Sequence, residues 1–347
     1  MSNEPGTGRR DDKQPRAILL GCAGERLSAA ERALFAEADP LGFILFQRNC
    51  CDRDQVRALV EEMRACVGRP AAPILIDQEG GRVARLKPPQ WRRYPAPAQL
   101  AALPDAEIAV RLGARLIADD LAALGVTIDC APVLDLPVPG ADGVIGDRAY
   151  GNTPARVSRL GRAMCEGLLE GGVLPVVKHM PGHGRARVDS HHALPVVDAD
   201  RDLLAATDFA PFRALAEFPW AMTAHVVYSA VDASRPATLS PKVIDAVIRG
   251  AIGFDGVLVS DDIGMGALAG SIAERVAGAL AAGCDVAMHC SGKLDEMREA
   301  AEASAPLTEA AAARVARGEA LRRCSRRAFD RAEAEARFDR LLGTIAG

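Results

Sequence analysis

Residues Val173 to His192 read VLPVVKHMPGHGRARVDSHH and carry the clearest structural signal in the chain. The first five are apolar and predict a short buried strand. The rest form a polar segment with two glycines that holds four of the chain's six histidines, together with Lys178 and Asp189. Polar segments at strand ends are where α/β sheets and barrels place their chemistry. This stretch is therefore interpreted as a strand of an α/β fold followed by a functional loop.

Strand-like apolar runs recur along the chain and alternate with helical patterns. Two predicted helices begin with an N-cap residue followed by proline, at Thr153-Pro154 and Ser240-Pro241. Eight strands that alternate with helices favour a closed (β/α)8 barrel of the TIM type over an open, doubly wound sheet. The predicted strands are residues 16–21, 42–46, 73–77, 126–133, 173–177, 220–224, 256–260 and 284–288.

The helical patterns lie between these strands and at the carboxyl end of the chain. Residues 308–342 are rich in Ala, Arg and Glu and predict one or two extra C-terminal helices. No linker and no solenoid repeat is visible, so residues 16–347 are expected to form a single α/β barrel domain after a flexible tail of residues 1–15. The other helices are expected from Ser28 onward and at residues 54–66, 105–124, 154–171, 199–216, 241–250 and 272–282.

Composition excludes several classes of protein. The net charge is −4, and no basic block lies beyond the amino-terminal tail, so the chain lacks the footprint of a nucleic-acid binder. There is no run of eighteen apolar residues and no apolar signal core, so no membrane span is expected. The nine cysteines form no CxxC pair or regular framework, which predicts buried, reduced thiols. We therefore expect a cytoplasmic protein.

Polar residues stand directly after several predicted strands. The carboxyl ends of barrel strands meet at one mouth, so these side chains are expected to converge there. Cations, imidazoles and carboxylates around one mouth suit a polyhydroxylated ligand, with or without acidic groups. In chain order the residues are Asp77, Glu79, Arg82, Arg85, Asp135, Asp147, Arg148, Lys178, His179, His225, Asp261 and Asp262.

Six motifs along the chain occur in the same order as in one known family of enzymes. They are IDQEGGRVARL (76–86), APVLDL (131–136), GVIGDRAYG (143–151), KHMPGHG (178–184) followed by DSH (189–191), MTAHVVY (222–228) and VSDDIGM (259–265). Together they resemble glycoside hydrolase family 3, most of all its single-domain β-N-acetylglucosaminidases of bacterial peptidoglycan recycling. The resemblance spans residues 17 to 300. It implies a retaining exo-glycosidase that removes terminal β-1,4-linked N-acetylglucosamine from muropeptides, with no metal and no cofactor.

The resemblance also implies roles for individual residues. Asp261, the first aspartate of SDD, matches the nucleophile that forms a covalent glycosyl-enzyme. His191 of DSH matches the general acid/base, and Asp189 matches the carboxylate partnered with it. The residues that match those holding the hydroxyls and acetamide of N-acetylglucosamine are Asp77, Arg85, Arg148, Lys178 and His179.

The chemistry of these residue types agrees with that implied mechanism. Retaining hydrolysis needs a carboxylate nucleophile and a separate proton donor. Asp261, at a strand end, suits a nucleophile whose line of attack must be fixed. An ordinary histidine titrates near pH 6.5 and both gives and takes protons near neutrality. Asp189 and His191 are two residues apart, so on an extended segment their side chains would share one side. Residues 182–194 are long and glycine-containing, as a movable loop would be.

Several alternatives stay open. A metal-dependent barrel hydrolase would need clustered ligands, but Pro181 and Gly182 between His179 and His183 preclude a helical metal pair. A non-catalytic sugar-binding barrel is disfavoured because the nucleophile and acid/base positions are both occupied. A β-glucosidase and a β-glycoside phosphorylase are closer alternatives, since a deprotonated histidine is neutral and does not repel phosphate. The only partner expected is a small carbohydrate substrate, bound by a monomer.

Overall fold

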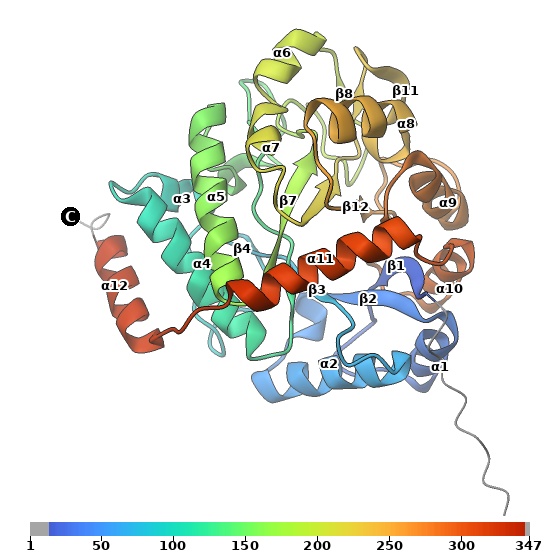
Figure 1. Ribbon diagram of the computed structural model, residues 1–347, viewed down its shortest axis with the longest axis horizontal. Coiled ribbons are helices and arrows are strands. Elements are labelled where there is room, and N and C mark those ends of the chain that lie inside the picture. Colours follow the sequence, from blue (N-terminus) through green and yellow to red (C-terminus); the bar gives the residue numbers. More distant parts are fainter. Residues whose placement is uncertain (1–13, 344–347) are drawn as a thin grey trace, which may run out of the picture.

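The computed structural model describes residues 14–343 and closes eight parallel strands into a barrel (Figure 1). Every neighbouring pair is parallel, and the last strand pairs with the first. The predicted (β/α)8 barrel is confirmed. Residues 1–13 of the predicted tail lie outside the described residues. The strands are β1 (Arg16–Leu20), β2 (Pro40–Leu45), β3 (Ile74–Ile76), β6 (Ile128–Asp129), β7 (Leu174–Met180), β9 (Trp220–Thr223), β12 (Val257–Asp262) and β13 (Val286–His289).

Helices surround the barrel, and their ends follow from local sequence. The hydroxyl of Ser28 accepts a hydrogen bond from the Glu31 amide at 3.1 Å, and the Glu31 carboxylate accepts one from the Ser28 amide at 2.8 Å. This capping box satisfies donors that a helix start leaves unpaired. Proline begins the helix after Thr153, as predicted. The surrounding helices are α1 (Ala29–Ala38), α2 (Arg53–Val67), α4 (Ala106–Ala122), α5 (Pro154–Glu170), α9 (Ile272–Ala282) and α10 (Leu294–Ala303).

Three predicted elements differ from the structure. The helix expected at residues 199–216 is two short helices, α6 (Arg201–Ala206) and α7 (Ala210–Ala214), because Pro211 has no N–H to continue one helix into the next. The helix expected at 241–250 is α8 (Pro241–Val243) continued by η4 (Ile244–Ala251), a π-helix. The fourth strand is only β6, since the residues after Asp129 include Pro132, which cannot donate to a ladder.

Some small elements were not predicted at all. The segment after β3 turns back as a hairpin of β4 (Gln78–Gly80) and β5 (Val83–Ala84). Gly80 and Gly81 both have positive φ there, and a Cβ on Gly80 would lie 2.4 Å from the Pro95 carbonyl oxygen, so the hairpin requires glycine. The other small elements are α3 (Pro97–Ala101), a sheet of β8 (Val196–Val197), β10 (Val227–Tyr228) and β11 (Asp232–Pro236), and the 3-10 helices η1 (Gln47–Asn49), η2 (Gly146–Arg148) and η3 (Ala237–Leu239).

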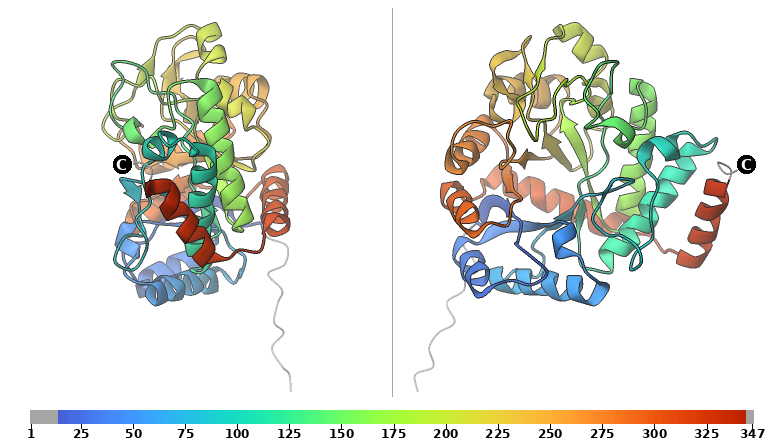
Figure 2. Two further views of the ribbon diagram at one scale, coloured as in Figure 1. Left: turned by 90° about the vertical axis from the view of Figure 1, so that its left-hand side faces the viewer. Right: turned by 180° about the vertical axis from the view of Figure 1, so that it is seen from behind.

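The carboxy-terminal helices leave one end of the barrel open. Helix α11 (Glu309–Ser325) crosses the end where the strands begin, and Gly318 lets it approach Trp220 of β9 closely (Figures 1 and 2). Helix α12 (Arg331–Gly343) packs beside α4, with Phe338 buried against Gly113. The carboxyl ends of the strands are therefore the open mouth. Within residues 14–343, no helix is long and apolar enough to cross a membrane.

We predict that Phe338→Ala lowers the free energy of unfolding by about 3–5 kcal/mol, because it leaves a cavity between α12 and α4. Turnover at low temperature should persist, since the mouth of the barrel lies elsewhere. Urea unfolding would measure the loss. The control is Arg337→Ala, an exposed neighbour on the same helix, which should change stability by no more than about 0.5 kcal/mol. Equal effects of the two substitutions would contradict the proposed packing of α12.

Candidate active site

A cavity of about 300 Å³ lies where the barrel strands end. The right-hand view of Figure 2 looks onto this end of the barrel, with α11 on the far side. The structure brings together around this cavity every residue to which the sequence assigned a role. They are Asp77, Arg85, Arg148, Lys178, His179, Asp189, His191 and Asp261.

One side of the cavity is a network of buried charges. The Lys178 ammonium lies 2.8 Å from Asp77 Oδ1 and 2.7 Å from Glu79 Oε1. The Arg148 guanidinium donates to both Glu79 oxygens at 2.8 Å, and Arg85 Nη2 donates to Asp77 Oδ2 at 2.9 Å. Strand β7 carries Lys178, whereas the other residues come from the loops after β3 and β6. Segments from three strand ends are thus joined through ion pairs.

These pairs keep the carboxylates ionised. Burial alone would raise the pKa of Glu79, but Lys178 and Arg148 outweigh it and lower that pKa to about 2. Burial acts against Asp77 in the same way, and Lys178 and Arg85 hold its pKa well below the usual range. Glu79 was predicted to lie at the mouth, but its motif did not indicate a role for it. Its separation of two residues from Asp77 was the available signal, since alternate residues of a strand share one face.

His179 is fixed by a carboxylate behind it. Its Nδ1 lies 2.7 Å from Asp135 Oδ2, and its Nε2 lies 3.5 Å from Arg148 Nη2. Asp135 Oδ1 also accepts the backbone N–H of His183 at 2.6 Å. The Asp135 side chain is fully buried, so it orients the ring and ties down the start of the histidine loop, residues 182–194. The sequence placed Asp135 at the mouth but did not reveal this function.

The two aspartates that end β12 have different surroundings. Asp261 Oδ1 accepts only the amide of Asp262 among the bonds of the described residues, at 2.8 Å. Burial alone would raise the pKa of Asp261, but the imidazole groups of His179 and His225 outweigh it and lower the pKa below its usual value. Asp262 Oδ1 instead accepts the amides of Gly264 and Cys290, at 2.9 and 3.1 Å. Both aspartates line the cavity, but Asp262 is engaged with the backbone of two segments, whereas the Asp261 carboxylate accepts a single recorded bond within residues 14–343.

Asp189 and His191 form the expected pair, but not on an extended segment. Asp189 Oδ1 lies 2.7 Å from His191 Nδ1 and accepts the His191 backbone N–H at 2.9 Å, so the segment is a turn. Burial would raise the pKa of Asp189, but the His191 amide and ring outweigh it and lower the pKa. The His191 ring is 60% exposed, at the outer edge of the cavity.

Comparison with known proteins places the whole barrel in one family. The model of the glycosyl hydrolase family 3 N terminal domain matches residues 14–318, which include every residue of the cavity. The chain belongs to glycosyl hydrolase family 3.

Relatives in family 3 resemble the chain over most of its length. A protein of Methylococcus capsulatus named Beta-hexosaminidase is 40% identical over 322 residues, 90% of this chain and 93% of its own. Another Beta-hexosaminidase, from Alkalilimnicola ehrlichii, is 42% identical over 79% of this chain and 80% of its own. The expected family is confirmed, and these names agree with the expected enzyme class, a β-N-acetylhexosaminidase.

Solved structures of family 3 show the same fold. NagZ from Neisseria gonorrhoeae, in complex with N-trifluoroacetyl-D-glucosamine, superposes with a TM-score of 0.81 at 32% identity, over 96% of this chain and 98% of its own. A family 3 beta-N-acetylglucosaminidase from Paenibacillus sp. has a TM-score of 0.83 at 34% identity, over 94% of this chain and 67% of its own.

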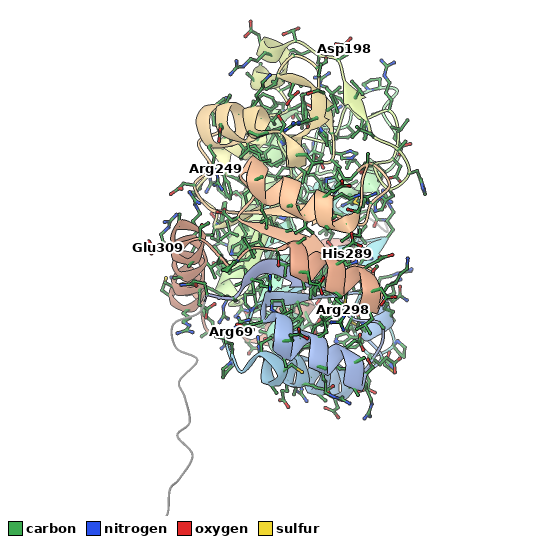
Figure 3. The ribbon with its side chains drawn as sticks, turned by 90° about the vertical axis from the view of Figure 1, so that its right-hand side faces the viewer. Arg69, Asp198, Arg249, His289, Arg298 and Glu309 are labelled. Carbon is green, nitrogen blue, oxygen red and sulfur yellow. The ribbon has the colours of Figure 1, made fainter. Side chains whose placement is uncertain are left out.

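Two features of this family 3 site were not foreseen. Part of the cavity lining is apolar and comes from separate strand ends, so no single motif predicted it; it includes Ile44, Phe46, Met222, Met265 and Met288. The histidines also do not act as one group. His289, labelled in Figure 3, is buried and directed to Ser291 and Glu296, and His225 bonds Thr238 and the Asp262 carbonyl. Across residues 14–343, no three His, Cys, Asp or Glu side chains form a group able to hold a metal ion.

We predict that Glu79→Ala lowers the free energy of unfolding by about 3–5 kcal/mol, because it leaves Lys178 and Arg148 buried with less counter-charge. A matched control exists on the same two loops. Arg82 and Asp147 form an ion pair at 2.8 Å in which both side chains are 47% exposed, and Asp147→Ala should cost less than about 1 kcal/mol. Urea unfolding of both variants would measure the difference. Similar losses would mean that burial of the Glu79 network adds nothing to stability.

Proposed function

We propose that this family 3 β-N-acetylhexosaminidase is a retaining exo-glycosidase. It removes the terminal β-1,4-linked N-acetylglucosamine of muropeptides of the GlcNAc-anhydro-MurNAc type, in cell-wall recycling. One observation carries the proposal: an ionised aspartate and an Asp–His pair border the same cavity as the network of Asp77, Lys178 and Arg148. The names of the relatives, which include a beta-N-acetylglucosaminidase, support the choice of sugar.

In the first step Asp261 acts as the nucleophile. Its carboxylate oxygen bonds to the anomeric carbon while the bond from that carbon to the leaving oxygen breaks, which yields a covalent glycosyl-enzyme. The lowered pKa of Asp261 suits this role, because the group must be ionised at neutral pH. Its place at the end of β12, with Oδ1 tied to the Asp262 amide, restricts its line of attack.

His191 supplies and recovers the proton. The protonated ring gives its Nε2 proton to the leaving oxygen, then takes a proton from the water that cleaves the glycosyl-enzyme. Asp189 holds Nδ1 at 2.7 Å, so Nε2 is the nitrogen left for the substrate. Because Asp189 remains an anion, it also stabilises the charged form of the ring during the reaction.

The charged network holds the sugar. Asp77 accepts hydrogen bonds from sugar hydroxyls, Arg85, Arg148 and Lys178 donate to hydroxyl and acetamide oxygens, and His179 Nε2 forms a hydrogen bond with a sugar hydroxyl. Because mutual ion pairs already fix these groups, binding orders few side chains, which favours a preformed site.

We place the enzyme in the cytosol. All nine cysteines are free, and Cys51 and Cys324 are exposed, which suits a reducing compartment. A β-glucosidase or a phosphorylase remains the nearest alternative activity, and the expected monomer remains a prediction.

We predict that the enzyme hydrolyses a nitrophenyl β-N-acetylglucosaminide at least about a hundredfold faster than the glucoside, since buried donors meant for the acetamide would be left unpaired. Added phosphate should not change the rate or the product. Asp261→Ala should be inactive on both glycosides while its circular dichroism stays normal. A preference for glucoside, or sugar phosphate as the product, would establish one of the alternatives.

We predict that His191→Ala slows substrates with poor leaving groups by about 10² to 10⁴-fold but spares activated aryl glycosides in the first step. An activated phenolate leaves with little protonation, so it does not need the donor. Asp189→Ala should show the same pattern more mildly. The measurement is log kcat/KM against leaving-group pKa for wild type and both variants. Parallel lines would show that another group supplies the proton.

A further inference from the structure

The residue between Asp189 and His191 points the opposite way from its neighbours. Ser190 is buried, and its hydroxyl lies 3.0 Å from Nε2 of His183 at the start of the same loop. His183 is buried as well, at 3% exposure, whereas the His191 ring is 60% exposed. The tip of the histidine loop is thus attached to the interior through one side-chain hydrogen bond.

His183 is itself held in place by Asp135 and His179. Its amide donates to Asp135 Oδ1 at 2.6 Å, and its ring meets the His179 ring edge-on with 5.8 Å between centroids. Its Nδ1 is buried and has no hydrogen-bond partner in the described part of the chain. Burial lowers the pKa of His183 to about 4, so the ring is neutral at cytosolic pH. Ser190 therefore provides the one hydrogen bond recorded for this ring within residues 14–343.

The outer side of the loop rests on the segment that follows Asp261. The amide of Gly266 donates to the His191 carbonyl at 3.2 Å, and the amide of Ala267 donates to the Ser190 carbonyl at 3.1 Å. A Cβ on Gly266 would lie 2.8 Å from the His191 carbonyl oxygen, so the two segments are in close contact. The Ser190 side chain is thus held from the interior by His183. The carbonyls of Ser190 and His191 are held by the loop that follows Asp261.

We infer that His183 and Ser190 are positioning residues, and that their hydrogen bond is a latch that holds His191 over the glycosidic bond. This inference rests on the proposed role of His191 as acid/base. With the latch formed, the backbone on both sides of Ser190 is held and the Asp189–His191 pair faces the cavity. With it broken, the loop swings outward and the proton donor leaves the reacting oxygen.

The energetic reason lies in the burial of both partners. Removing the Ser190 hydroxyl leaves Nε2 of His183 buried without a partner, which is unfavourable in the closed loop. Opening the loop lets water satisfy that nitrogen. The loss of the hydroxyl therefore shifts the population toward the open state, by about tenfold or more.

Two variants of equal size isolate the hydroxyl. Ser190→Thr keeps it, and Ser190→Val replaces it with a methyl group of similar volume, so steric effects cancel between them. Hydrogen exchange of peptides spanning residues 183–194 and 264–268 reports the latch without reference to activity. We expect faster exchange in Ser190→Val than in Ser190→Thr. Equal exchange in the two variants would overturn the latch, whatever their kinetics.

A leaving-group series then tests positioning. Relative to Ser190→Thr, Ser190→Val should lose about tenfold or more in kcat on an alkyl N-acetylglucosaminide and almost nothing on a dinitrophenyl one. His183→Gln, which retains a polar group near the Nε2 position, should resemble Ser190→Thr, and His183→Leu should resemble Ser190→Val. Arg187→Ala, an exposed change on the same loop, should behave as wild type.

The outcomes separate this inference from the proposed function. A steep leaving-group dependence in His191→Ala with a wild-type slope in Ser190→Val would keep His191 as the donor and overturn its positioning by Ser190. A wild-type slope in His191→Ala would instead remove His191 as the donor, and with it the catalytic meaning of the latch. Faster exchange with steep slopes in both Ser190→Val and His191→Ala would support the inference.

Discussion

The arrangement of the mouth depends on one buried cation, the ammonium group of Lys178. It is held between the carboxylates of Asp77 and Glu79, and Arg148 pairs with Glu79 from a third segment. Breaking such a pair leaves a charge isolated in a medium that solvates it poorly. Separating the strand ends therefore costs free energy. The sugar-binding groups proposed here are the same groups that hold the mouth together, which is why this side of the cavity is preformed.

The barrel below provides the rigid frame for that network. Strands β1, β2 and β7 are buried almost throughout, as parallel strands covered by helices usually are. Helix α11 covers the end where the strands begin, so polar loops are free to gather only at the opposite end. Asp261 is the next-to-last residue of β12, and its position is therefore set by the barrel rather than by a loop.

The interactions that hold the proposed proton donor are weaker than those that hold the proposed sugar-binding groups. The position of His191 depends on the contact of its ring with Asp189 and on three neutral hydrogen bonds: between the Ser190 hydroxyl and His183, from the Gly266 amide to the His191 carbonyl, and from the Ala267 amide to the Ser190 carbonyl. Bonds of that kind contribute about 0.5–1.5 kcal/mol each, so the closed loop is only marginally favoured. A loop that must admit a substrate and release a product needs such a balance. The buried ion pairs on the sugar side of the site are thus stronger than the neutral hydrogen bonds that hold the loop proposed to move.

The sequence by itself predicted the barrel and its eight strands, because apolar periodicity is a local signal, and its motifs, through their resemblance to family 3, singled out eight of the residues that line the cavity. It failed where distant contacts decide. Pro132 and Pro211 shortened predicted elements, Glu79 and Asp135 gained partners from other strands, and the apolar part of the cavity lining was assembled from four strand ends. The Ser190–His183 bond also belongs to the tertiary structure alone, since only folding buries both groups and makes that pairing matter.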